Sequence, residues 1–111
     1  MEQKQRCEPR YPFLRSAELS EDGSGARMNS RISDLSLNGC YVDTVNPLSD
    51  GAFLHLRIFT ETRSFEAPAT VVHSHAFMGM GMKFREVQPK SGEVLRLWLP
   101  KATEQAKQAY A

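Results

Sequence analysis

The sequence predicts a mainly β fold, a six-stranded antiparallel β-barrel with one C-terminal α-helix. Six short segments rich in apolar residues follow one another along the chain, and Gly, Pro, Asn and Asp residues separate them. A wide apolar stripe then follows Pro89, which is typical of a helix that packs on another element. The 111 residues suffice for one hydrophobic core and are too few for two ordinary domains.

The first strands are predicted around a hairpin turn. Residues 13–19 alternate imperfectly between apolar and polar, and the Glu-Asp-Gly-Ser-Gly segment at 21–25 supplies the conformations that a hairpin turn needs. In the third segment, Cys40 and Val42 share one face while Tyr41 takes the other. The six predicted strands are residues 13–19, 26–33, 39–45, 53–59, 62–73 and 77–84.

Glycine and proline residues refine the later elements. Pro68 marks an edge or a bulge in the fifth strand, because proline has no N–H for a sheet ladder. Gly79 and Gly81 indicate a bend or a close backbone approach in the sixth strand. Pro89 suits the first turn of the helix, and Pro100 is expected to end it. The apolar stripe, which should cover an open end or face of the barrel and place its tryptophan in the core, comprises Val94, Leu95, Leu97, Trp98 and Leu99.

The chain is expected to have three parts. Residues 1–11 are polar, contain Pro9 and precede Pro12, which favours a mobile N-terminal arm over a helix or a central strand. Residues 12–99 form the barrel and helix. Residues 100–111 are Ala-rich and polar without an apolar face, which predicts a frayed or disordered tail.

The composition bears on where in the cell the protein is located. No apolar run approaches the roughly 20 residues of a membrane-spanning helix, and the first residues are polar where a signal peptide would be apolar. We therefore expect a cytoplasmic protein without membrane insertion. Cys7 and Cys40 are isolated, so both are expected to be reduced thiols.

The charge is small overall but uneven. A formal net charge of +1 argues against a broad nucleic-acid-binding surface, which would need many cationic contacts to phosphates. The first 15 residues nevertheless carry four cations and two carboxylates, a local excess of two positive charges. This distribution is compatible with a small anionic ligand near the N-terminus.

Two arginines in this region are suited to hold such a ligand. Arg6 and Arg10 lie four residues apart on a segment that Pro9 keeps from being regular helix. If the segment is extended, their Cα atoms lie roughly 13 Å apart, enough to reach separate parts of one dinucleotide. A guanidinium donates two parallel hydrogen bonds to guanine O6 and N7 or to a phosphate. By itself, however, an Arg-x-x-x-Arg pattern is equally typical of a solvated arm.

An Asp-x-Ser-x-x-Gly segment supplies the complementary groups. Asp34 can accept hydrogen bonds from N1 and N2 of guanine, and Ser36 can donate to a phosphate oxygen. Gly39 would allow either a close approach of backbone to the ligand or a positive φ. The same segment is also at home in an ordinary turn, where Asp and Ser bond their own backbone.

In combination these motifs resemble the PilZ domain family. Arg6-x-x-x-Arg10, a strand and a hairpin, Asp34-x-Ser36-x-x-Gly39, and a late Gly-x-Gly-Met-x-Phe before a helix occur in that family's order from residue 6 to about residue 99. The resemblance implies a PilZ-like split barrel that binds cyclic di-GMP and has no catalytic residues, metal or cofactor. The arginines would contact guanine and phosphate groups, and Asp34, Ser36 and Gly39 would bind from the barrel surface.

The resemblance also implies a mode of action. A single-domain sensor would fold its arm over the nucleotide and signal to an unidentified downstream protein. Many family members have a further Arg before the first motif Arg, where this chain has Gln5. Gln offers no charged planar face for stacking on a guanine, so we expect one ligand per chain. The sequence does not define the oligomeric state.

Other functions receive less support from the sequence. The leading alternative is a small barrel that binds protein or single-stranded nucleic acid through Tyr11, Phe13 and Tyr41 with nearby arginines, although the net charge is low for nucleic acid. His73 and His75 share a strand face, yet two ordinary strand histidines explain them better than a metal site. No nucleophile-elbow pattern surrounds Ser36, which argues against a hydrolase.

Overall fold

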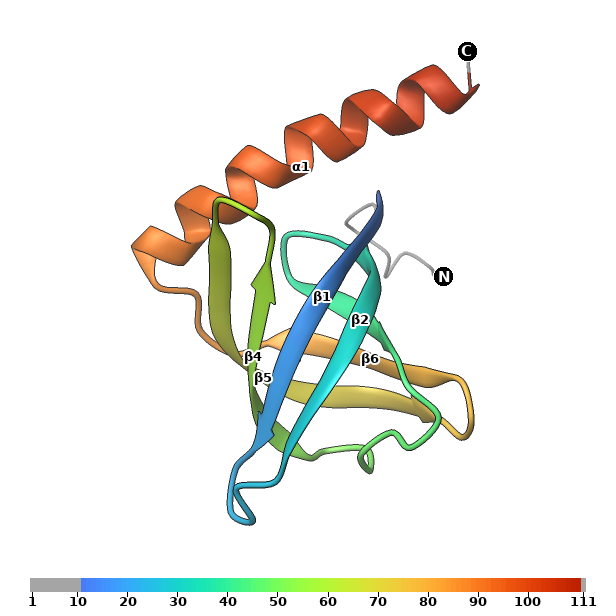
Figure 1. Ribbon diagram of the computed structural model, residues 1–111, viewed down its shortest axis with the longest axis vertical. Helices are drawn as coiled ribbons and strands as arrows, with labels where there is room; N and C mark the ends of the chain where they lie inside the picture. The colour runs from blue at the N-terminus through green and yellow to red at the C-terminus, as the bar shows by residue number, and fades with distance from the viewer. Residues whose placement is uncertain (1–10, 111) are drawn as a thin grey trace, which may run out of the picture.

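The computed structural model describes residues 11–110, and the side chains of residues 12–99, as a closed barrel capped by a helix. Figure 1 shows the helix lying across one end of the barrel. This architecture confirms the predicted fold class. The elements are β1 (Tyr11–Glu21), β2 (Arg27–Leu35), β3 (Gly39–Asp43), β4 (Phe53–Phe59), β5 (Ser64–His75), β6 (Gly79–Phe84) and α1 (Pro89–Tyr110).

The strands are joined into a ring in the order β1-β2-β3-β6-β5-β4. Every neighbouring pair is antiparallel, and the ring is closed where β1 pairs with β4. Hairpins connect β1 to β2, β2 to β3, β4 to β5 and β5 to β6, whereas β3 meets β6 across 35 intervening residues, 44–78. Closure gives each strand a neighbour on both sides along part of its length, which leaves short stretches at the strand ends with one neighbour.

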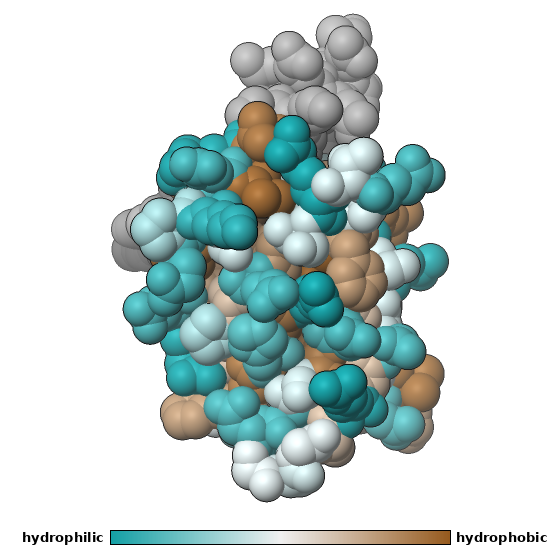
Figure 2. Space-filling view, turned by 60° about the vertical axis from the view of Figure 1, so that its left-hand side comes forward, coloured by the Kyte–Doolittle hydropathy of each residue, from teal (hydrophilic) through white to brown (hydrophobic). Residues whose placement is uncertain are grey.

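The core follows from the period of two along each strand. In β4, buried and exposed residues alternate, so Leu54, Leu56 and Ile58 point inward. Phe65 of β5 and Phe84 of β6 meet inside the barrel with ring centroids 4.9 Å apart. Polar residues cover most of the outer face seen in Figure 2, where hydrophobic residues show only in small separate areas. The barrel interior therefore supplies the main hydrophobic core.

β1 begins earlier than the sequence predicts. We expected Tyr11 to belong to the arm, but it pairs with Leu35, and Pro12 pairs with Asp34. Proline is tolerated here because β1 pairs with β4 only from Ser16 onward, so this part of β1 has a neighbour on one side alone. The β1–β2 register shifts between Pro12 and Arg15, which accommodates the proline at an irregular stretch.

The helix packs on the barrel through its first half. Leu95, Trp98 and Leu99 are buried, and the ring of Trp98 lies 5.2 Å from the ring of Phe13 in β1. This placement confirms that Trp98 is part of the core. The hydroxyl of Ser91 accepts a hydrogen bond from the backbone N–H of Glu66 at 3.3 Å, which fixes the start of the helix against β5.

Pro100 does not end the helix, contrary to the prediction. α1 continues through it to Tyr110. The missing N–H of a proline removes one helical hydrogen bond, but the following residues include Ala, Glu, Gln and Lys, which favour helix strongly. Within residues 11–110, no helix combines the length and apolar character needed to span a bilayer.

The β5–β6 hairpin ends in an unusual turn. Its backbone closes through a hydrogen bond from Met78 N–H to His75 O of 3.0 Å, and Phe77 has a φ of 66°. Glycine is the common residue at such a position, because a side chain is strained there. Phe77 is nevertheless 80% exposed, so burial does not compensate the strain.

Candidate functional site

The Asp-x-Ser-x-x-Gly segment forms the turn between β2 and β3. Ser36 N–H donates to Gly39 O at 2.9 Å, and the Ser36 hydroxyl lies 3.2 Å from both Gly39 O and Gly39 N. Ser36 is only 6% exposed. Its side chain is therefore directed into the turn, where it can accept from the Gly39 N–H and donate to the Gly39 carbonyl.

Gly39 is required by the neighbouring strand. It pairs with Lys83 of β6, and a Cβ at this position would collide with the backbone carbonyl oxygen of Met82. The positive φ that we considered for Gly39 is wrong, since only Gly23, Gly25 and Gly51 have positive φ among the described glycines. The close approach occurs between β3 and β6.

Asp34 begins a row of cross-strand neighbours on the outside of the barrel. It pairs with Tyr41 in β3, Tyr41 pairs with Gly81 in β6, and Gly81 pairs with His73 in β5. Residues adjacent to this row in the strands, such as Val42 and Met82, are buried in the core. The outward row Asp34–Tyr41–Gly81–His73 is called the motif row below.

Aromatic rings and glycines shape the surface of the motif row. The Tyr41 hydroxyl lies 3.1 Å from Nδ1 of His75, and the rings of His73 and His75 stack with centroids 6.4 Å apart. A Cβ on Gly79 would meet the Tyr41 ring at 2.6 Å, which explains this glycine. The predicted close approach at Gly79 is thus made by the side chain of Tyr41 and by the β3 backbone.

Tyr41 and His73 were not predicted to lie beside Asp34. Hairpin register was the available signal for Tyr41, because a short turn after Asp34 returns the chain beside it. No comparable signal exists for His73, since β5 reaches the site only through β6. Among the described residues, no three His, Cys, Asp or Glu side chains gather closely enough to hold a metal ion.

Arg6 and Arg10 lie outside the described residues, as does Cys7. The chain enters β1 at Tyr11, whose partner Leu35 follows Asp34 directly. The described part of the chain therefore places the start of β1 at the motif turn.

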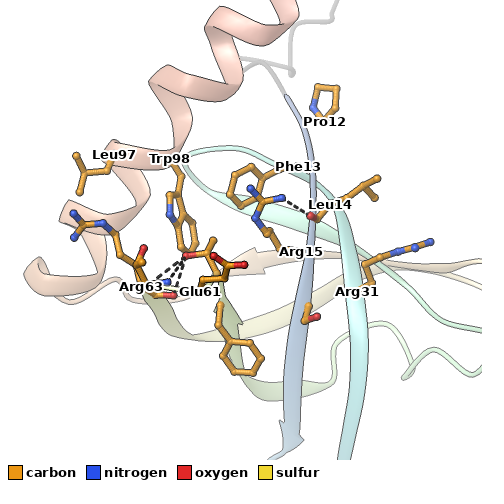
Figure 3. A pocket seen from close by; sticks show the side chains of 13 residues that line it. Pro12, Phe13, Leu14, Arg15, Arg31, Glu61, Arg63, Leu97 and Trp98 are labelled. Atoms are coloured by element: carbon orange, nitrogen blue, oxygen red, sulfur yellow. Dashed lines mark hydrogen bonds between the residues drawn. The ribbon is translucent and has the colours of Figure 1, made fainter.

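Three arginines of the barrel, Arg15, Arg31 and Arg85, lie in two separate regions. Arg85 Nη2 lies 3.3 Å from Asp22 Oδ2, and the guanidinium carbon lies 4.6 Å from the centre of the Phe53 ring, so Arg85 packs beside the β1–β2 turn. Arg31 lies 3.5 Å from Asp43. Arg31 also lines an open cleft of about 1170 Å³ between β1, the β4–β5 loop and α1, together with Arg15 (Figure 3).

Comparison with known proteins identifies relatives by sequence model and by fold. The model of the PilZ domain matches residues 4–100. A search of curated protein sequences finds no match. The PilZ domain with c-di-GMP of YcgR from Escherichia coli superposes with a TM-score of 0.75 at 16% identity, covering 96% of this chain and 98% of that one.

Two further solved structures have the same fold. The PilZ domain of CeSA from a cellulose synthesizing bacterium gives a TM-score of 0.63 at 17% identity, covering 78% of this chain and 90% of that one. The K. pneumonia MrkH–c-di-GMP complex gives 0.76 at 18% identity, with 96% of this chain but 56% of the MrkH chain covered. At such identities the structures establish the shared fold.

Proposed function

Because the chain belongs to the PilZ domain family, we propose that it binds cyclic di-GMP at the motif row and transmits the binding to a partner protein. The observation that carries this proposal is the position of Asp34. Asp34 lies in β2 between the start of β1 and β3, so its carboxylate is carried beside the strand start that follows the N-terminal segment and beside the residue that carries the Tyr41 ring. PilZ domains are non-catalytic receptors of cyclic di-GMP, and the chain is accordingly not an enzyme.

Each group has a distinct role in the proposed complex. Asp34 accepts hydrogen bonds from N1 and N2 of one guanine, which no other base offers as a pair of donors. Arg6 and Arg10 donate to guanine O6 and N7 and to phosphate oxygens. Tyr41 is the β3 partner of Asp34, and its ring, which lies over Gly79 and Gly81 of β6, gives a base an apolar face on which to stack.

Ser36 and Gly39 support the site through the backbone. The Ser36 hydroxyl is already engaged with Gly39, and Gly39 packs against β6, so both residues keep the turn in one shape. We assign them as positioning residues for the Asp34 carboxylate. A phosphate contact by Ser36, which the sequence suggested, would require its hydroxyl to leave the turn.

Titration calorimetry with cyclic di-GMP tests the proposal. Arg10→Ala and Asp34→Ala should each weaken binding by about 1 to 3 kcal/mol, or roughly fivefold to 150-fold, because each removes a paired guanine contact. Arg27→Ala and Asp50→Ala are the matched controls, since both residues are exposed and lie outside the motif row. The fitted stoichiometry should be one ligand per chain because Gln5 replaces the additional arginine.

Two results would reject this assignment: no binding by the parent protein, or equal binding by the parent and both variants. Strong, salt-sensitive binding to a single-stranded oligonucleotide would instead favour the alternative barrel function. Two aromatic residues of that alternative, Phe13 and Tyr41, lie on different surfaces, however. Phe13 packs against Trp98 under the helix, whereas the Tyr41 hydroxyl contacts His75 on the outer face of β3 and β5.

A further inference from the structure

A strand, a loop and a helix form the three walls of the cleft under α1. The first half of β1 forms one wall, the β4–β5 loop a second, and the face of α1 that carries Leu97 and Trp98 a third (Figure 3). It is an open cleft of about 1170 Å³, somewhat more than the roughly 300 to 1,000 Å³ of typical small-molecule pockets. Its size and openness are better suited to a chain segment than to an enclosed small ligand.

The charged residues of the cleft are predominantly cationic. Arg15, Arg31 and Arg63 line it, against one carboxylate, Glu61. Arg15 is held in place, because its Nη1 donates to Leu14 O at 2.7 Å and its guanidinium lies 4.8 Å from the centre of the Phe13 ring. Each of these contacts leaves other N–H groups of the Arg15 guanidinium available, since the group has five.

Arg63 has its charge available as well. The backbone of Arg63 is hydrogen-bonded to Thr60, and within the described residues its guanidinium makes no ion pair. Among the residues with described side chains, 12–99, Arg31 makes one ion pair, an exposed contact with Asp43 at 3.5 Å, which is a weak interaction. The cleft therefore has positive charge that the described residues do not neutralise.

Apolar surface accompanies this charge. Leu14 and Leu97 are 57% and 47% exposed and line the cleft, and between them the Phe13 and Trp98 rings are packed together. Exposed large apolar side chains beside arginines and aromatic rings are the composition of protein–protein contact sites. A lining of Leu, Phe, Trp and Arg offers an apolar patch for one side chain and cationic groups for its neighbours.

We propose that the cleft is the docking site for an acidic segment of a partner protein, with an apolar side chain of the segment over the Phe13 and Trp98 rings between Leu14 and Leu97, and flanking carboxylates on Arg15 and Arg63. An acidic segment is the expected occupant because its carboxylates complement the excess of arginines that line the cleft. The cleft adjoins the motif row, because Pro12 lines the cleft and pairs with Asp34. Control of docking by the nucleotide rests on the proposed function, whereas docking itself does not.

Trp98 provides a direct measurement. It is the only tryptophan of the chain and lines the cleft, so its fluorescence reports occupancy. The probe is the synthetic peptide Glu-Glu-Leu-Glu-Glu, titrated into the full chain at low salt, with Gln-Gln-Leu-Gln-Gln as the neutral peptide. The acidic peptide should change the Trp98 emission saturably, and the neutral peptide should bind about tenfold or more weakly because it lacks the charge-assisted hydrogen bonds.

Arginine variants locate the binding. Arg15→Ala and Arg63→Ala should each lower the affinity for the acidic peptide about threefold to tenfold, which is the range expected for a charge pair that is partly exposed to solvent. Arg27→Ala removes the same charge from the far end of β2 and should leave the affinity unchanged. Equal weakening by Arg27→Ala would overturn the proposal, because it would show attraction by net charge alone. A single-stranded oligothymidine that displaces the peptide and binds more tightly would also overturn it.

The nucleotide is tested separately. If cyclic di-GMP controls docking, a saturating concentration should change the affinity for the acidic peptide, and the peptide should change the affinity for cyclic di-GMP by the same factor. If the chain binds cyclic di-GMP but does not bind the acidic peptide, the docking site is rejected and the proposed function remains intact. Peptide binding at the cleft in a chain that does not bind cyclic di-GMP would reject the proposed function alone.

Discussion

At the scale of single residues, the glycines of β3 and β6 are fixed by different contacts. Gly39 faces the backbone carbonyl of Met82, and Gly79 faces the β3 backbone and the Tyr41 ring. Gly81 has only an ordinary contact, 3.8 Å from a Cβ position to Cδ1 of Tyr41. A motif glycine beside a ligand site can thus be required by packing between strands rather than by the ligand.

Gly39→Ala should destabilise the fold by about 1 to 3 kcal/mol, because backbone atoms of Met82 and Lys83 cannot move aside as a side-chain tip would. Gly81→Ala is the matched control on the paired strand and should cost less than about 1 kcal/mol, since its new Cβ finds space. Urea denaturation measures both. A Gly39→Ala protein as stable as the parent would show that this glycine serves the ligand alone.

Phe77→Gly should leave the free energy of unfolding unchanged or raise it by up to about 1 kcal/mol. Glycine relieves the strain of a φ of 66°, and Phe77 buries too little surface to lose much, although glycine adds entropy to the unfolded chain. Phe77→Val should instead lower stability, because a β-branched residue is poorly tolerated at positive φ. Thermal melts should therefore give a lower melting temperature for Phe77→Val than for Phe77→Gly, and a melting temperature of Phe77→Gly below that of the parent would contradict this reasoning.

At the scale of elements, β1 and α1 depend on each other. The first part of β1 pairs with β2 but has no partner in β4 before Ser16, and α1 supplies a contact on that side through Trp98 and Phe13. The helix thus takes the place of a neighbouring strand at the end of the barrel. Loss of this contact should loosen the start of β1, where Asp34 and Pro12 are paired.

Trp98→Ala should destabilise the protein by about 3 to 5 kcal/mol, because it removes a large buried side chain at the helix–barrel contact. Leu97→Ala changes the adjacent residue of the same helix and should cost less than about 1 kcal/mol, since Leu97 is 47% exposed. Denaturation followed by circular dichroism compares them without relying on Trp98 fluorescence. Equal losses would show that the helix does not pack on the barrel through Trp98.

At the scale of the whole molecule, the sequence predicted the architecture better than it predicted the site. The strand at Phe53–Phe59 was predicted with its observed bounds, because a mostly apolar run follows turn residues at 46–47 and 50–51. The motif row was not predicted beyond Asp34, since the pairing of β3 with β6 is non-local and leaves no local signature. Pro12 was expected to precede the first strand and Pro100 to end the helix, because proline disfavours both elements. Strand pairing with β2 and the helix-forming residues after Pro100 outweigh this preference.

Refolding should be slow for a chain of this size. The β1–β4 and β3–β6 ladders join segments far apart in the sequence, and such contacts place barrels in the range of roughly milliseconds to seconds. Stopped-flow dilution from urea, followed by Trp98 fluorescence, measures the rate, because Trp98 packs only when α1 meets β1. A relaxation within microseconds would indicate that local contacts dominate folding instead.

The turn that carries Ser36 and Gly39 rests on a strand that comes much later in the chain. Both sequence motifs lie at or before residue 39, whereas β6, on which the turn rests, ends at Phe84. A nascent or truncated chain that stops before β6 therefore carries every motif residue without the strand that holds Gly39 and completes the row from Asp34. Under the proposed function, binding of cyclic di-GMP should therefore require the sixth strand, and a chain truncated before β6 should not bind the nucleotide.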